Sequence, residues 1–389
     1  MQKIKIIRTA TVALSLDYLL KGQLAFLNER YEIVAVSGED AHLENVAKRE
    51  GVRTVNVPMQ RAIRPLQDLV SLWQLYRLFK KEKPQIVHSI TPKAGLLSMV
   101  AAKMAGVPIR IHTFTGLIFP SKQGMLQQLL IAMDRLLCWA ATTIIPEGKG
   151  VKNDLVAYKI TSKPLAVLAK GNVNGIDTNY FSPEAIPAKE KENLKNQLHI
   201  QPTDFVFVFV GRLVGDKGIN ELVEAFGKLE MGDWGLRKGI KLLLVGPFET
   251  DLDPLKTETL KAIQTNPNII AVGFQQEVRS YFAIANALVF PSYREGFPNV
   301  VLQAGAMELP SIVSNINGCN EIIKEDYNGL LIPAKDSNAV YDAMKKMVED
   351  KALCQKLKAN SRQLIVDNYE QKVVWNAILN EYKKLEENV

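Results

Sequence analysis

The stretch YREGFPNVVLQAGAMELPSI, residues 293–312, places polar residues between an apolar run and a helical pattern. Gly296 and Pro298 indicate a tight entry into a helix that we expect to begin near Asn299. The unpaired amides and positive dipole end of that helix suit a phosphate or a sugar hydroxyl. Glu295 would accept hydrogen bonds from hydroxyls, or alternatively would only complement the helix dipole.

A second polar loop lies in FVFVFVGRLVGDKGINELVEAF, residues 205–226. Its glycines, Gly211 among them, allow close approach of a ligand, and Arg212 and Lys217 supply two cations between a buried strand and a helix. This combination favours a diphosphate, although solvated surface charges are the alternative. The spacing matches neither a Walker motif nor the GxGxxG fingerprint, and the turn RTATVALSL has no glycine, so we expect no dinucleotide site there.

Three of the other polar positions lie near the ends of expected strands. His112, in RIHTFTGLIF, is flanked by threonines and a glycine that could present polar groups to a sugar or phosphate. His88 and Lys93, in VHSITPKAG, could face an acceptor or serve the structure alone. His42 and His199 are interpreted as surface residues.

No metal site is expected. Asp251 and Asp253, in ETDLDPL, have the Asp-x-Asp spacing, but we interpret them as solvated loop residues. The three cysteines are too few and too scattered for a zinc site or a disulfide framework. Arg212, Lys217 and a helix start would then supply the positive charge that a metal gives elsewhere.

The elements that must position these residues alternate between strand-like and helical segments. Six strand-like runs occur before residue 150 and six more after residue 205, which is typical of parallel α/β sheets. We predict two Rossmann-like domains facing across a cleft. The predicted bounds are 1–172 for the first, acceptor-side domain, 173–365 for the second, donor-binding domain and 366–389 for a final helix that packs back across the interface. Ligands of such sheets bind at the carboxyl ends of strands.

Charge is distributed unevenly along the chain. Residues 1–172 contain 24 Lys and Arg against 12 Asp and Glu, whereas the remainder is slightly acidic. No nucleic-acid recognition motif is present. The helical stretch 65–82 and its flanks carry Arg61, Arg64, Arg77, Lys80, Lys81 and Lys83 around an apolar face of Leu69, Leu72, Trp73, Tyr76 and Phe79. This face either packs on the sheet or, with its basic neighbours, contacts anionic lipid.

No targeting or membrane-spanning segment is expected. The first residues lack a signal-peptide pattern, and no run approaches the roughly 18 apolar residues of a membrane helix. We therefore expect a cytoplasmic protein, at most peripheral at the inner face of a membrane.

Several of these segments together resemble one family. GRLVGDKGINELVEAF, the region 272–323 and NGLLIP are similar to the C-terminal domain of family-4-type retaining glycosyltransferases of the GT-B fold. HSITPKAGLLSMVAAKMAGVPIRIHTFTGLIF resembles the N-terminal domain of members that build bacterial surface polysaccharides. The resemblance covers nearly the whole chain in order.

The resemblance implies a role for each matching position. Arg212 and Lys217, next to Gly211, would grip the donor diphosphate, and His112 would lie at the cleft edge near the donor sugar. Glu295 would contact the donor sugar, with Gly296, Phe297, Pro298 and Asn299 beside it. The family has a second glutamate eight residues later that holds the ribose; here that position is Gln303, which loses charge assistance worth on the order of 1 kcal/mol.

The expected function is that of a metal-independent retaining glycosyltransferase without a cofactor. It would move a sugar from a nucleotide-sugar, most simply a UDP-sugar, to a lipid-linked saccharide in polysaccharide biosynthesis. The resemblance implies retention by front-face attack, with the leaving phosphate taking the acceptor's proton. The alternatives are a catalytically weak sugar-nucleotide-binding protein, which Gln303 would suit, and a sugar-nucleotide epimerase of related fold. A nicotinamide-dependent dehydrogenase is disfavoured because the glycine fingerprint is missing.

Overall fold

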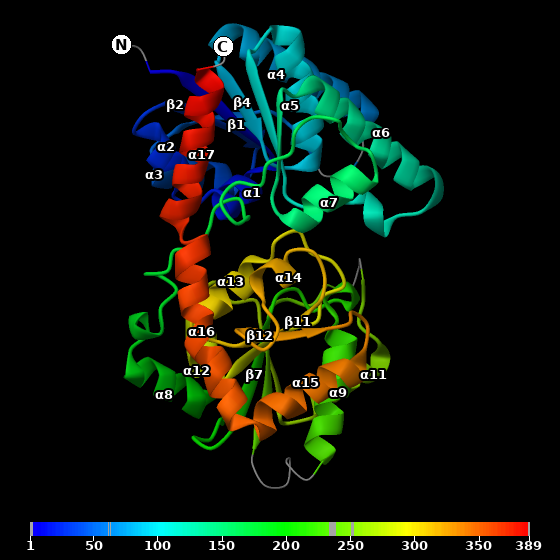
Figure 1. The fold of residues 1–389 in the computed structure, drawn as a ribbon, viewed down its shortest axis with the longest axis vertical. Coiled ribbons are helices and arrows are strands. Elements are labelled where there is room, and N and C mark those ends of the chain that lie inside the picture. The colour runs from blue at the N-terminus through cyan, green and yellow to red at the C-terminus, as the bar shows by residue number, and fades with distance from the viewer. Residues whose placement is uncertain (1–2, 61, 63, 233–238, 250–252, 388–389) are drawn as a thin grey trace. The chain divides into compact units, whose positions relative to one another are not determined.

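The computed structural model describes residues 3–60, 62, 64–232, 239–249 and 253–387. The chain forms two compact units: unit 1 comprises Met1–Gly175 and Gln371–Val389, and unit 2 comprises Ile176–Glu370 (Figure 1). The chain enters unit 2 and leaves it at neighbouring points, because the Ile176 amide donates to the Tyr369 carbonyl at 2.7 Å. The predicted limits of 172 and 365 differ from these by a few residues, and the last helix belongs to unit 1.

Unit 1 is built on a parallel sheet of six strands in the order β3-β2-β1-β4-β5-β6. The strands are β1 (Lys5–Val12), β2 (Glu32–Gly38), β3 (Arg53–Asn56), β4 (Ile86–Ser89), β5 (Ile109–Phe114) and β6 (Thr143–Pro146). Alternation along β1 sends Ile6 and Ile7 to opposite faces, each buried in a separate hydrophobic cluster. Both faces are therefore covered, as parallel sheets require.

Different helices cover the two faces of this sheet. The cluster around Ile7 includes residues of α4 (Pro65–Glu82), α5 (Pro92–Ala105), α6 (Gly124–Ala140) and α7 (Lys149–Ala157). The cluster around Ile6 includes residues of α1 (Ala13–Leu19), α2 (Gln23–Asn28), α3 (Ala41–Glu50) and the last helix α17 (Gln371–Glu386). A short 3-10 turn, η1 (Phe119–Ser121), precedes α6.

Unit 2 repeats this plan with the order β12-β11-β10-β7-β8-β9, again parallel. Its strands are β7 (Phe205–Val210), β8 (Ile240–Val245), β9 (Ile269–Gly273), β10 (Ala287–Phe290), β11 (Ser311–Ser314) and β12 (Gly329–Ile332). β7 is apolar at every position, as expected for a strand buried on both faces.

Helices of unit 2 pack against one another in three sets. The helix α9 (Ile219–Met231) contacts α11 (Thr257–Thr265) and α15 (Ser337–Glu349). The helix α13 (Asn299–Ala306) contacts α14 (Cys319–Ile322) and α16 (Lys351–Tyr369), while α12 (Arg279–Ile284) contacts α8 (Ala188–Gln197). Two 3-10 turns, η2 (Pro183–Ala185) and η3 (Gly215–Lys217), complete the unit.

The predicted fold class is confirmed, because each of the twelve expected strand runs contains an observed parallel strand. β7 stops at Val210, before Gly211 and Arg212, and β10 stops at Phe290, before Glu295. The polar residues singled out above therefore follow the strands as loops. None of the helices described in the structure is long and apolar enough to cross a membrane.

Candidate active site

The candidate site lies where the sheet of unit 2 changes its direction of winding. β7 and β10 are neighbours, but the chain continues from β7 to β8 on one side and from β10 to β11 on the other. The loops that follow β7 and β10 therefore diverge from a common point at the carboxyl edge of the sheet, the topological switch point. Ligands of doubly wound sheets bind at such a point.

Glycines allow these two loops to touch. Gly218 has φ of +72°, and a Cβ there would lie 2.1 Å from the Pro291 carbonyl oxygen. Gly318 has φ of +75°, and a Cβ there would lie 2.2 Å from the Gly296 carbonyl oxygen. No other residue type fits either place without movement of the main chain. The loops after β7, β10 and β11 are thus packed backbone to backbone around the site.

Lys217 and Glu295 form an ion pair across the switch point. Their side chains are only 16% and 14% exposed, so the pair is shielded from solvent. The Lys217 ammonium also lies 5.5 Å from the centre of the Phe290 ring. The two residues predicted to handle the diphosphate and the donor sugar are therefore in direct contact, although 78 positions separate them in the chain.

Arg212 is held by a carboxylate that the sequence did not suggest. Its Nη1 donates to Glu249 Oε2 at 2.7 Å, and the Arg212 side chain is 44% exposed. Glu249 belongs to the loop after β8. Each of the two cations predicted to grip a diphosphate is thus paired with an acid from a neighbouring loop.

Asp253 holds the turn that carries Lys217, which corrects its interpretation as a solvated loop residue. Its carboxylate accepts from the Asp216 amide at 2.5 Å, and its carbonyl accepts from the Gly215 amide at 3.2 Å. Asp251 lies outside the described residues. Within the described ranges, no group of three or more His, Cys, Asp and Glu is arranged to hold a metal.

The loop after β10 is clamped to the same turn. The Tyr293 amide donates to the Asp216 carbonyl at 2.8 Å, and Arg294 pairs with the Asp216 carboxylate at 3.1 Å. The Tyr293 hydroxyl donates to Glu221 at 2.7 Å. Burial and the adjacent Glu221 raise the pKa of Tyr293, which keeps this hydroxyl a donor at physiological pH.

The predicted helix start is confirmed, since α13 begins at Asn299 with Pro298 as the preceding residue. The Phe297 ring is buried, 5.6 Å from the Tyr369 ring, so it anchors the loop and does not offer a surface for a ligand. Whether another part of Phe297, such as its main chain, contacts the donor stays a prediction.

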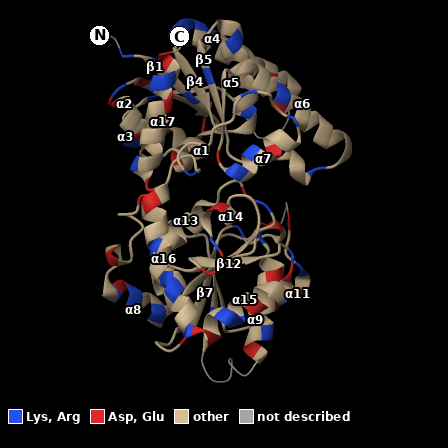
Figure 2. Ribbon diagram, in the orientation of Figure 1, with Lys and Arg blue, Asp and Glu red and all other residues tan. Residues whose placement is uncertain are grey.

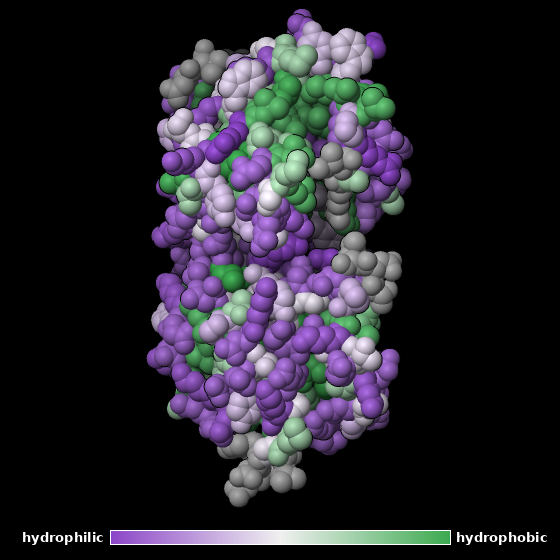
Figure 3. All heavy atoms as spheres, turned by 90° about the vertical axis from the view of Figure 1, so that its right-hand side faces the viewer, coloured by the Kyte–Doolittle hydropathy of each residue, from purple (hydrophilic) through white to green (hydrophobic). Residues whose placement is uncertain are grey.

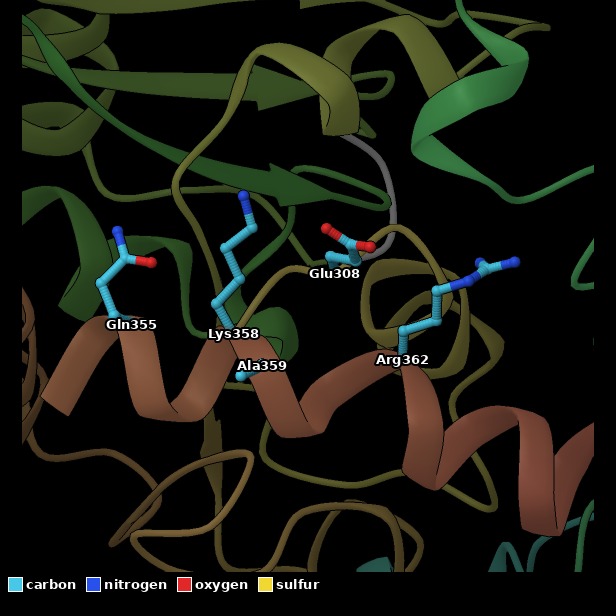
Figure 4. Close-up of a pocket in the computed structure, with 5 residues that line it drawn as sticks. All are labelled: Glu308, Gln355, Lys358, Ala359 and Arg362. Carbon is cyan, nitrogen blue, oxygen red and sulfur yellow. The ribbon is translucent and has the colours of Figure 1, made fainter.

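Gln303 lies on α13 and is half-buried, and its side chain has no hydrogen-bond partner among the residues that the structure describes. Glu308 follows the far end of this helix, about 12 Å from its start by helical rise. It lines a separate pocket with Gln355, Lys358, Ala359 and Arg362, where side chains from α16 project around it (Figure 4). Arg362 donates hydrogen bonds to the Thr178 and Phe181 carbonyls. We therefore interpret this pocket as part of the packing between α16 and the segment 178–181, and not as a ligand site.

His112, predicted to lie at the cleft edge near the donor sugar, belongs to the carboxyl half of β5 and is buried in unit 1. It is 1% exposed, its Nδ1 lies 2.8 Å from Ser89 Oγ, and its ring fills the space beside Gly95. Burial lowers its pKa to about 3, so the ring is neutral at physiological pH. A role in catalysis stays a prediction.

His88 belongs to a buried network that ties α17 to the sheet. Its ring nitrogens lie 2.6 Å from Tyr382 Oη and 2.8 Å from Thr113 Oγ1. Arg8, fully buried, donates to Tyr382 Oη at 3.0 Å and to Gln23 at 2.9 Å, and its Nε and Nη2 have no partner in the described part of the chain. Both structural and acceptor-facing interpretations of His88 were open, and its contacts favour the structural one.

The remaining polar positions of unit 1 are also engaged. Lys93 is 9% exposed and pairs with Asp68 at 2.8 Å. His42 is half-buried and lies 2.6 Å from Asp17, which corrects its interpretation as a surface residue, whereas His199 is exposed. At the switch point between β1 and β4, Thr11 and Thr91 share a 2.8 Å hydrogen bond, and neither residue was singled out from the sequence.

Two parallel six-stranded sheets in tandem, with paired cations and acids at the switch point of the second, define a protein of the GT-B fold class. Solved structures of similar fold agree with this class. A glycosyltransferase from Rickettsia africae ESF-5 aligns over 100% of both chains with a TM-score of 0.82 and 17% identity. Anabaena Alr3699/HepE in complex with UDP covers 98% of this chain and 100% of its own, with a TM-score of 0.80 and 14% identity.

Sequence comparisons identify the family. Residues 190–364 match the model "Glycosyl transferases group 1" and residues 23–171 match "Glycosyl transferase 4-like domain". The capsular polysaccharide biosynthesis glycosyltransferase CapM of Staphylococcus aureus is 30% identical over 98% of this chain and 97% of its own. The Escherichia coli UDP-Gal:alpha-D-GlcNAc-diphosphoundecaprenol alpha-1,3-galactosyltransferase is 29% identical over 88% of this chain and 86% of its own. The chain belongs to the group 1 glycosyl transferases and is a glycosyltransferase.

Proposed function

We propose that this glycosyltransferase moves a sugar from a UDP-sugar to a lipid-diphosphate-linked saccharide during synthesis of a surface polysaccharide, with retention and without a metal. The Lys217–Glu295 pair carries the proposal, because it places a cation and a hydroxyl acceptor together at the switch point. The names of the relatives support the chemistry. The Escherichia coli relative is named for a UDP-linked donor and a diphosphoundecaprenol acceptor, and the Anabaena structure contains UDP.

The donor would replace the present partners of the two cations. A diphosphate entering over the start of α13 would accept hydrogen bonds from Lys217 and Arg212 in place of Glu295 and Glu249. Glu295, released from Lys217, would then accept from the hydroxyls of the donor sugar. Gln303 would accept from the ribose through its amide oxygen, without charge assistance.

The reaction would build negative charge on the departing diphosphate. The bond between the anomeric carbon and the phosphate oxygen breaks, a bond to the acceptor oxygen forms on the same face, and the acceptor's proton passes to the leaving phosphate oxygen. Lys217, Arg212 and the amides at the start of α13 would stabilise that charge more in the transition state than in the ground state. We assign no protein nucleophile.

Calorimetric binding of UDP, GDP and ADP in the presence of EDTA tests the donor and the absence of a metal together. We expect selective binding of UDP, reduced in Arg212→Ala and unchanged in the control Lys228→Ala, which alters an exposed residue of α9. Binding that requires a divalent cation would refute the metal-free site. Nuclear magnetic resonance of the product would report the anomeric configuration, and inversion would refute retention.

A further inference from the structure

The sheet of unit 1 has a switch point of its own, between β1 and β4. The chain continues from β1 to β2 on one side and from β4 to β5 on the other, as it does after β7 and β10 in unit 2. The helix α5 begins at Pro92, shortly after β4 ends at Ser89, so its first residues lie at the carboxyl edge of the sheet. Because ligands of doubly wound sheets bind at such an edge, unit 1 has a ligand position of its own.

Lys93, the second residue of α5, carries a shielded positive charge at this point. Its ammonium lies 2.8 and 3.0 Å from the two carboxylate oxygens of Asp68 in α4, and it also donates to the Ala62 carbonyl. Among the lysines whose ion pairs the structure describes, Lys93 and Lys217 are the least exposed, at 9% and 16%. The switch point of each unit thus has a lysine–carboxylate pair that is largely shielded from solvent.

Packing alone does not account for the pair in unit 1. The neighbours of Lys93 on α5, Ala94 and Leu97, belong to the hydrophobic cluster around Ile7. Replacement of a shielded ion pair by apolar residues of similar volume is often neutral or stabilising, because desolvation of the two charges offsets most of their attraction. The charge of Lys93 is instead explained by an anionic ligand that takes the place of Asp68.

Two threonines fix the start of α5 against β1. The Thr11 amide donates to Thr91 Oγ1 at 2.8 Å, and the two hydroxyls share a hydrogen bond of the same length. The Ala94 amide donates to Thr11 Oγ1 at 3.1 Å. The main chain of Lys93 is therefore held by the central strands and not by the ion pair, so we expect it to stay in place when Asp68 is displaced.

A second cation adjoins the pair. Arg64 directly precedes α4 and is exposed, and its amide donates to Asp68 Oδ2 at 3.2 Å. Arg61, in the same loop, lies outside the described residues. Figure 2 shows further Lys and Arg on α4. In Figure 3, apolar residues gather over the upper part of unit 1, and hydrophilic residues are more frequent at its lower end, where its strands terminate.

We propose that Lys93 and Arg64 bind the diphosphate of the acceptor at the switch point of unit 1, where it displaces Asp68 from Lys93. The inference rests on the proposed function, in which the acceptor carries a diphosphate between its lipid and its sugar. Each phosphate accepts charge-assisted hydrogen bonds from one cation, as the donor diphosphate is proposed to do at Lys217 and Arg212. Asp68 keeps the Lys93 side chain oriented while the acceptor is absent.

Two interpretations of Lys93, acceptor-facing and structural, predict the same ion pair but opposite effects of removing the acid. If the pair only packs α4 against α5, loss of either partner leaves the other unmatched, and both losses weaken any binding to unit 1. If the pair holds a diphosphate site, loss of the Asp68 charge removes a carboxylate that competes with the phosphate and repels it.

Calorimetry with farnesyl diphosphate, an isoprenyl diphosphate, tests the proposal on the full chain with the donor site filled by saturating UDP. We expect Lys93→Met to weaken binding of the probe by about tenfold or more, since a charge-assisted hydrogen bond is lost, and Arg64→Gln to weaken it less. Asp68→Asn should strengthen binding, because the amide oxygen still accepts from the Arg64 amide but carries no charge. Lys48→Met is the control, since Lys48 of α3 is an exposed, paired lysine of the same unit.

Farnesol and UDP separate the possible outcomes. Farnesol lacks the diphosphate, so its binding should not respond to Lys93→Met, and UDP alone should bind this variant and wild type equally. If UDP binds neither protein, the proposed function fails, whereas the response of farnesyl diphosphate binding to Lys93→Met still reports on unit 1. Arg64→Gln alters an exposed side chain and keeps the test decisive if Lys93→Met does not fold.

Three results would overturn the inference. Equal weakening by Lys93→Met and Asp68→Asn would show that the pair only packs the two helices. Absence of farnesyl diphosphate binding to wild type would show that unit 1 has no such site. Weaker binding in Arg212→Ala, together with unchanged binding in Lys93→Met, would place the probe in the donor site of unit 2.

Discussion

Lys217 Nζ contacts Glu295 Oε1, joining the loop after β7 to the loop after β10 in a pair largely shielded from solvent. In the donor complex proposed above, the diphosphate would replace this carboxylate beside Lys217. The pair therefore keeps the lysine oriented before the donor arrives. Because partly buried pairs are costly to break on one side only, we expect the two residues to be coupled energetically.

In a double-mutant cycle at this pair, the double variant should recover stability relative to the single variants, but it should not recover activity. Lys217→Met and Glu295→Gln should each destabilise unit 2, and the double variant should regain part of that loss because no charge is left unpaired. Activity should not recover, since loss of Lys217 removes transition-state stabilisation worth about 10²-fold in rate. Chemical denaturation measures the stability, and initial rates of sugar transfer measure the activity. Additive destabilisation would show that the pair is not coupled.

Asp253→Ala should weaken UDP binding although Asp253 lies beneath the loop that carries Lys217. Loss of its carboxylate frees the Asp216 amide and loosens the turn that positions Lys217. We expect KM for the donor to rise by about tenfold, in line with the loss of a positioning hydrogen bond worth roughly 1–2 kcal/mol. Asp342→Ala, at an exposed position of α15, is the control. Unchanged donor kinetics in Asp253→Ala would show that Asp253 does not position Lys217.

Gln303→Glu should tighten donor binding. A charge-assisted bond to a hydroxyl exceeds a neutral one by on the order of 1 kcal/mol, which corresponds to about fivefold in affinity. Calorimetry with UDP and with uridine, which lacks the diphosphate, measures this gain. A gain of similar size for both ligands would assign the contact to the ribose, whereas no gain for either would place Gln303 away from the nucleoside.

Stability should fall in mild acid because of the buried histidines. Burial lowers the pKa of His112 to about 3 and also lowers that of His88. In the unfolded chain both titrate near pH 6.5. The unfolded state therefore binds protons that the native state excludes, so stability present above about pH 6.5 is lost as the pH falls, at about 1.4 kcal/mol per pH unit for each histidine.

His112→Asn isolates this effect, because carboxylates elsewhere titrate equally in both proteins. Denaturation at pH 7 and pH 5 should show a smaller loss in His112→Asn than in wild type. Equal losses would mean that protonation of His112 is not excluded in the native state.

Tyr382→Phe should destabilise unit 1 by about 1–3 kcal/mol, because Arg8 and His88 each lose a buried partner. Tyr327→Phe, at an exposed position of unit 2, is the matched control. Hydrogen exchange should show faster opening of α17 in Tyr382→Phe, whereas unchanged exchange would show that the hydroxyl does not hold the helix.

The sequence was sufficient for the strands, their parallel arrangement and the start of α13, because apolar periodicity and helix-entry residues are local signals. It also located Lys217, Arg212 and Glu295 in loops after strands. It could not identify Glu249 or Asp253, which follow β8, as partners of these loops. Their contacts depend on the order of strands in the sheet, which places β7 between β8 and β10.

Tertiary structure alone decided which polar and apolar groups are exposed. His112 follows the same strand pattern whether it is buried or open, and packing against neighbours such as Gly95 and Phe114 makes it part of the core. On α6, Ile131 and Leu137 are buried whereas Leu129 and Leu136 are exposed, although all four are equally apolar in sequence, because α6 packs only one of its sides against α5 and the core. Burial depends on neighbours that are distant in the chain, and a local pattern holds no information about them.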